Sequence, residues 1–201
     1  RNTVPADDKL MIAESFYTIG QHNDALPWLN DVCTGESQSL RCMELAALSA
    51  EKAEKLPEAV KWYEQVVREG TGEKYQDYAF HLGELYEQMN MREKAIGRYT
   101  ANIARYTNDV RNYNSLARLY RAGGEYEKAE NVRKKAVDIK DAPPEIRKDL
   151  ADVMATQDQK DAAIEQYKEY VAQSPGDSAA WKKLGELYFS IYKYYKERNN
   201  K

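Results

Sequence analysis

The chain has 201 residues, of which 31% are charged and 42% hydrophobic, and its formal net charge is −3. This composition is typical of a folded globular protein rather than a disordered one. The acidic balance argues against a protein that binds nucleic acid through its charge, since such proteins are basic. No apolar run approaches the roughly 18 residues of a membrane-spanning helix, so we expect no span.

Residues 6–39 predict two helices joined by a turn. Leu10, Ala13 and Phe16 share one helical face, and Gly20 ends the first helix because it tolerates the left-handed backbone conformation. The second helix carries Ala25 on its apolar face.

Residues 40–75 and 76–109 predict two further helix pairs. In each pair, a small residue near the start of the second helix is followed four residues later by an aromatic ring, as in Ala59 with Tyr63 and Ala95 with Tyr99. The stretch Gly70-Thr-Gly72 is too short for a phosphate-binding loop and indicates a longer turn.

Residues 110–143 and 144–177 predict the fourth and fifth pairs. Ala163 and Tyr167 keep the spacing of a small residue and a ring, whereas Arg133 replaces the ring in the fourth pair. We expect weaker packing there, unless Val132 compensates.

Residues 178–201 begin with Asp177 or Ser178 as a helix cap, followed by Trp181, Leu184 and Tyr188 on one face. The aromatic tail from residue 192 to 201 either extends this helix as a cap or starts a second helix. The chain starts without Met and stops abruptly, so we expect it to be a piece of a longer protein.

Two series of small residues share one period. The first is Ala13, Ala47, Gly83, Ala117, Ala151 and Gly185, and the second, twelve positions later, is Ala25, Ala59, Ala95, Ala129 and Ala163. Both advance by 34 residues, with one step of 36, which indicates stacked helical repeats. Together with the pattern Trp181-x-x-Leu-Gly-x-x-Tyr188, this period makes the whole chain resemble the tetratricopeptide repeat (TPR) family.

The resemblance implies an all-α fold, an α-solenoid of stacked antiparallel helix pairs that form a right-handed superhelix. We expect one array over residues 1–201, with about five full repeats and a C-terminal helix. The expected repeats are 6–39, 40–75, 76–109, 110–143, 144–177 and a partial repeat at 178–201. A single helix pair cannot bury its apolar face, so stability must come from contacts between neighbouring pairs.

Cys33 and Cys42 stand at the end of one predicted helix and the start of the next. The turn between them makes a disulfide geometrically feasible, and two buried thiols in a cytosolic protein are the alternative. A disulfide formed in the cell would indicate the periplasm or cell envelope, since cytosolic thiols stay reduced. Otherwise we expect a cytoplasmic protein.

Catalytic signals are almost absent from the sequence. The two histidines, His22 and His81, stand in no metal-binding or catalytic-triad spacing. We therefore predict a protein that is not an enzyme and that has no catalytic, metal or cofactor residues.

The resemblance also implies that the first helix of each repeat lines a concave groove that binds a partner segment. The groove positions carried over to this chain are Asp77, Phe80, Glu84, Glu87, Arg111, Asn114, Arg118, Arg121, Lys148 and Asp152, with Glu145 and Ala155 beside them. The three arginines and the asparagine form one stripe that could grip a carboxylate, so an acidic peptide is a candidate partner. The alternative is a solvated face whose arginines pair with the acidic stripe of the third repeat.

We therefore expect a protein-interaction scaffold that binds a protein or peptide segment, with no nucleic acid and no membrane span, in a bacterial envelope or secretion assembly. The alternative is a TPR arm of a larger enzyme or polysaccharide-export machine. Self-association through the C-terminal helix is a further expectation, if its tyrosines form an exposed apolar patch.

Overall fold

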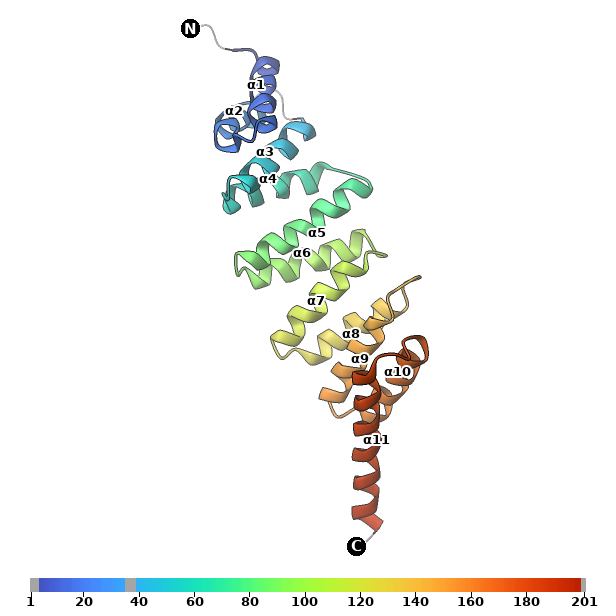
Figure 1. Ribbon diagram of the computed structural model, residues 1–201. Coiled ribbons are helices and arrows are strands. Elements are labelled where there is room, and N and C mark those ends of the chain that lie inside the picture. Colours follow the sequence, from blue (N-terminus) through green and yellow to red (C-terminus); the bar gives the residue numbers. More distant parts are fainter. Residues whose placement is uncertain (1–3, 35–38, 200–201) are drawn as a thin grey trace. The chain divides into compact units, whose positions relative to one another are not determined.

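The computed structural model describes residues 4–34 and 39–199, and within these ranges it contains eleven α-helices and no strand (Figure 1). The helices are α1 (Ala6–Thr18), α2 (His22–Thr34), α3 (Leu40–Lys52), α4 (Leu56–Glu69), α5 (Glu73–Gln88), α6 (Arg92–Arg105), α7 (Val110–Ala122), α8 (Tyr126–Val137), α9 (Glu145–Thr156), α10 (Lys160–Gln173) and α11 (Ser178–Asn199). The predicted all-α fold is confirmed.

The helices form two compact units, one ending at Asn102 and the other beginning at Ile103, within α6. In the first unit, α2 contacts α1 and α3, and α4 contacts α3 and α5. In the second unit, α8 contacts α7 and α9, and α10 contacts α9 and α11. Within each unit an even-numbered helix therefore packs between two odd-numbered ones, as stacked repeats require. A single continuous array over residues 1–201 stays a prediction.

The turn inside each helix pair recurs at one position of the repeat. A residue with positive φ stands there in all five complete pairs, namely Gly20 (79°), Glu54 (58°), Asn90 (57°), Gly124 (74°) and Asp158 (61°). This left-handed residue ends the first helix of the pair and lets the chain reverse. The next residue in the series, 34 positions after Asp158, is Tyr192, and α11 runs straight through it. Of the two alternatives for the aromatic tail, the structure therefore has the extended helix.

Buried tyrosines of the second helices fill the space beside the small residues of the first helices. A Cβ atom added to Gly83 in α5 would lie 2.4 Å from the ring of Tyr99 in α6, so the two helices are in close contact there. The hydroxyl of Tyr99 donates to Glu87 over 2.8 Å, which satisfies the polar end of a fully buried ring.

Two other repeats also pair a buried tyrosine with a carboxylate, twelve residues before the ring at Glu51 and fifteen before it at Asp152. Tyr63 donates to Glu51 over 2.8 Å, and Tyr167 donates to Asp152 over 2.5 Å. Burial, reinforced by the adjacent carboxylate, raises the pKa of both tyrosines far above the ordinary value, so both rings stay neutral.

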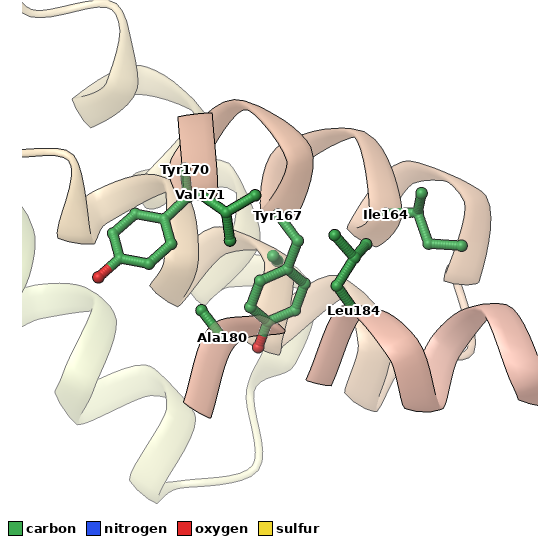
Figure 2. Close-up of a cluster of buried hydrophobic side chains, with 7 residues drawn as sticks. Ile164, Tyr167, Tyr170, Val171, Ala180 and Leu184 are labelled. Atoms are coloured by element: carbon green, nitrogen blue, oxygen red, sulfur yellow. The ribbon is translucent and has the colours of Figure 1, made fainter. Parts of the chain in front are cut away.

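The core of the second unit continues from α10 onto α11. Figure 2 shows Ala180 and Leu184 of α11 facing Tyr167 and Val171 of α10. Leu187 and Ile191 pack against the same cluster but are only partly buried. The first half of α11 is therefore held by α10, and its C-terminal end extends beyond the other helices of the unit (Figure 1).

A disulfide joins Cys33 at the end of α2 to Cys42 at the start of α3, with their Cα atoms 5.7 Å apart. Ser39 caps α3 by accepting a hydrogen bond from the backbone nitrogen of Cys42 over 3.2 Å. The cap and the covalent link together fix where α3 begins relative to α2.

Candidate functional site

Of the four groove residues predicted on α5, two pack against α6 and two are exposed to solvent. Glu87 is half-buried and accepts the hydroxyl of Tyr99, and the ring of Phe80 lies 5.8 Å from that of Tyr99. Asp77 and Glu84 are exposed, and Glu84 lies 3.2 Å from a ring nitrogen of His81. Two of the four predicted groove residues therefore support the contact between α5 and α6.

The predicted arginine stripe lies on α7, but its first member is engaged locally. Arg111 forms a two-pronged ion pair with Asp109, in which Nε and a terminal nitrogen each lie 2.9 Å from a carboxylate oxygen. Asp109 also accepts the backbone N–H of Arg111 and so caps α7. This cap holds the Arg111 guanidinium at the start of the helix.

Asn114 is also engaged, by an arginine from the second helix of its own repeat. Arg133 of α8 donates to the side-chain oxygen of Asn114 and forms an ion pair of 2.7 Å with Asp149 of α9. Arg133 is only 7% exposed, although it is charged. Burial lowers its pKa, and the positive charge of Arg121 acts in the same direction, whereas Asp149 opposes the shift.

The fourth repeat thus replaces a ring and a carboxylate with two arginines. Tyr99 and its acceptor Glu87 are twelve residues apart, and the same spacing separates Arg133 from Arg121. A tyrosine hydroxyl and its carboxylate acceptor in the third repeat correspond to two cations in the fourth. This substitution leaves the second unit with a local excess of positive charge on the α7 side.

Arg118 and Arg121 line a pocket of about 710 Å³ within the second unit. Its lining also includes Ala122 of α7 and residues of α8, α9, α10 and α11: Tyr126, Asp152, Ala155, Thr156, Tyr167, Lys183, Glu186 and Leu187. The same two arginines line a smaller cavity of about 330 Å³ together with Asn114, Arg133 and Asp149. The guanidinium groups of Arg118, Arg121 and Arg133 therefore all line the smaller cavity, and the first two also line the larger one.

Sequence reasoning missed the contribution of α11 to this pocket. Glu186 stands 34 residues after Asp152 and 68 after Arg118, at the same position of the repeat. Extending the groove positions to the partial sixth repeat would have found it. Lys183 lies outside those positions, and the stripe pattern gave no signal for it.

The fifth repeat contributes two predicted residues with different environments. Lys148 lies 2.6 Å from Asp177, which also accepts the hydroxyl of Tyr170 over 2.9 Å. Asp152 is half-buried at the pocket wall, where it accepts the hydroxyl of Tyr167. Asp152 therefore brings a carboxylate to the pocket, and Lys148 is held at the start of α9.

The described residues contain no cluster of His, Cys, Asp or Glu that could hold a metal ion. His81 lies between Glu51 (3.0 Å) and Glu84 (3.2 Å), and His22 packs edge-on against Tyr17. Within residues 4–34 and 39–199, no helix has the length and apolar character to cross a membrane.

Residues 113–147 and 144–187 match models of the tetratricopeptide repeat. No curated protein sequence matches the chain.

Three solved structures illustrate the similarity of the fold. YrrB, described as a TPR protein with an unusual peptide-binding site, is 14% identical over 89% of this chain and 91% of its own, with a TM-score of 0.61. A TPR protein from Parabacteroides merdae is 16% identical over 94% and 74% of the two chains, with a TM-score of 0.60. Part of a TPR protein from Cytophaga hutchinsonii is 13% identical over 89% and 69%, with a TM-score of 0.63. The family matches over residues 113–187 and this shared helical-repeat fold confirm the resemblance to the tetratricopeptide repeat family seen in the sequence.

Proposed function

We propose that this protein is a non-catalytic scaffold that binds an acidic segment of a partner protein in the pocket of its second unit. Members of the TPR family bind protein or peptide partners. The observation that supports an acidic segment here is the replacement of a tyrosine and its carboxylate by Arg133 and Arg121.

The charges around the pocket favour a carboxylate over a neutral ligand. Arg118, Arg121 and Lys183 are opposed by Asp152 and Glu186, and Asp152 already accepts a hydroxyl. Arg118 and Arg121 are exposed at their side chains and can reach a ligand without leaving the helix. A guanidinium can grip a carboxylate through two parallel hydrogen bonds, which gives both strength and orientation.

The test is peptide binding with charge-reversed variants. The probe is a fluorescently labelled peptide of alternating alanine and glutamate with blocked ends, and its neutral twin carries glutamine in place of glutamate. Arg118→Glu with Arg121→Glu should weaken binding at least about tenfold, because each lost charge-assisted hydrogen bond contributes roughly 1.5–3 kcal/mol.

The matched control reverses two exposed lysines of the same unit, Lys135→Glu with Lys140→Glu, and changes the net charge equally. The control should bind the acidic peptide nearly as well as the unaltered protein. An equal loss of affinity for the acidic peptide in both double variants would show that the net charge of the protein, and not this pocket, determines binding. Equal binding of the neutral twin would exclude a carboxylate site.

We also propose an oxidising compartment, the periplasm or cell envelope, because the Cys33–Cys42 disulfide would be reduced in a typical cytosol. Alkylating free thiols at the moment of lysis and weighing the intact protein tests this. Addition of two alkyl groups would contradict it. An interaction scaffold in a secretion assembly fits such a location, and an arm of a larger export enzyme remains the alternative prediction.

A further inference from the structure

Helix α11 exposes a face that the other odd-numbered helices bury. Its small residue, Gly185, is exposed, and a Cβ atom added there would meet nothing within 4 Å. The equivalent residues in the complete pairs are all buried: Ala13, Ala47, Gly83, Ala117 and Ala151. A glycine leaves a notch in the helix surface where other residues have a Cβ atom. At Gly83 this notch is filled by the ring of Tyr99, which comes from the second helix of the pair.

Aromatic side chains flank this open notch. Trp181 is 49% exposed and Tyr188 is 50% exposed, whereas Tyr113 and Tyr86, at the same two positions of the repeat, are 6% and 5% exposed. In the complete pairs the following helix covers these positions: Ala136 of α8 packs on Tyr113, and Lys94 of α6 lies over the ring of Tyr86. The face of α11 is thus shaped for a second helix.

The described part of the chain does not supply that helix. Tyr192 occupies the position where the other pairs turn back, and α11 continues to Asn199. Glu197 stands where the second helix of each pair has its small residue, 34 positions after Ala163. Residues 192–199 therefore run along the axis of α11, away from the notch.

The repeats also define what chemistry would fill the notch. In the fifth pair, Ala163 and Tyr167 of α10 pack against α9, and the Tyr167 hydroxyl donates to Asp152, directly after Ala151. In α11, Glu186 directly follows Gly185, so it stands ready to accept the hydroxyl of a tyrosine seated in the notch.

Charge and continuity define the partner further. Helix α11 carries five basic and two acidic side chains, namely Lys182, Lys183, Lys193, Lys196 and Arg198 against Glu186 and Glu197, which favours an acidic helix. Leu187 and Ile191 already pack against the α10 cluster and remain partly exposed, so a docked helix would extend an existing core.

We propose that this face of α11 is the docking site for an amphipathic, acidic helix of another protein, which presents the pattern Ala-x-x-x-Tyr to Gly185 and Glu186. A second copy of the chain does not offer this pattern from its described residues. Its versions within one helix begin at Ala13, Ala59, Ala95 and Ala163, all fully buried, and the remaining one, from Ala122 to Tyr126, spans the turn between α7 and α8 and so is not presented by a helix. Glu186 also lines the pocket of Arg118 and Arg121, whereas Gly185, Trp181 and Tyr188 are not among the residues of its lining.

The probe for the test is a fluorescently labelled, helix-stapled peptide with the sequence of residues 160–173, which contains Ala163 and Tyr167 and has two lysines against three acidic residues. Fluorescence anisotropy should show saturable binding to the intact protein. Gly185→Leu, which fills the notch, should weaken binding at least about tenfold, as overpacking of a close contact predicts. Gly97→Leu is the control, because Gly97 is also a helical, exposed glycine with open space around it.

The hydroxyl is tested in the peptide. Replacing the peptide tyrosine that corresponds to Tyr167 with phenylalanine should weaken binding about two- to tenfold, as expected for one hydrogen bond, and Glu186→Gln in the protein should remove most of that difference. Circular dichroism verifies that each variant is folded.

Three outcomes would overturn the proposal. The first is the absence of saturable binding, and the second is equal binding by the Gly185→Leu and Gly97→Leu variants. The third is a dimer in sedimentation that Gly185→Leu dissociates, because a second copy would then cover the face. The Arg118 and Arg121 double variant should bind this helical peptide unchanged, which separates this test from that of the acidic pocket.

Discussion

Replacing Gly83 with alanine should destabilise the first unit, although alanine is the better helix former. The added Cβ atom would lie 2.4, 2.7 and 2.9 Å from three ring atoms of Tyr99. That ring cannot easily move, because it is fully buried, bonded to Glu87 and packed against Phe80. Overpacking of this kind costs about 1–3 kcal/mol, and the gain in helix propensity offsets about 1 kcal/mol of it.

The control is the same substitution at Gly97, a glycine of the same unit whose added Cβ atom would meet nothing within 4 Å. Gly97→Ala should stabilise the protein by about 1 kcal/mol through helix propensity alone. Because that contribution is common to both variants, the difference between their free energies of unfolding isolates the packing cost of about 1–3 kcal/mol. Equilibrium urea denaturation followed by circular dichroism measures it. Equal changes in the two variants would refute the close approach of α5 and α6.

Two further predictions concern the disulfide and a half-buried network of polar contacts around Asp177. Reducing the disulfide between Cys33 and Cys42, which are nine positions apart, should lower the free energy of unfolding by about 2.7 kcal/mol according to the loop-entropy relation. A variant with alanine at both positions is the control, because its stability should not respond to the reductant. An unchanged midpoint of urea denaturation on reduction would contradict this prediction. The hydrogen bond from Lys148, with those from the Ala180 backbone and Tyr170, holds the pKa of Asp177 well below its usual value, so its contribution to stability is present above about pH 4 and lost as the pH falls. An acid titration of Asp177→Asn should therefore show a smaller loss of stability than that of the unaltered protein, and identical titrations would exclude this contribution.

The sequence was sufficient to predict the helices and the turns between them. Those features depend on contacts that recur with the period, such as Gly83 against Tyr99. One residue with positive φ per pair, from Gly20 to Asp158, could be placed from the same period. Gly20, Asn90, Gly124 and Asp158 also follow a local rule, because Gly, Asn and Asp adopt the left-handed conformation at low cost, whereas Glu54 follows from the period alone.

The partners of the residues in the arginine stripe could not be predicted from the spacing of those residues along α7. Arg111 is held by Asp109, a helix cap two residues away that competes with any ligand. Arg133 was expected only to weaken the packing, but it bonds Asn114 on α7 and Asp149 on α9. These contacts depend on side-chain directions between neighbouring helices, which the spacing of residues within one helix does not define.

The positions where this chain departs from its own repeat mark the two proposed sites. The pair of Tyr99 and Glu87 buries a ring and satisfies its hydroxyl. Arg133 and Arg121 fill the same places with two cations, and removing a guanidinium from water is unfavourable unless its partners compensate. Asn114 and Asp149 compensate Arg133, whereas Arg121 lines the pocket, where a bound anion would compensate its charge. The same reasoning applies to Tyr192, which replaces a turn residue and leaves the face of α11 uncovered, an arrangement that costs stability unless another helix docks there.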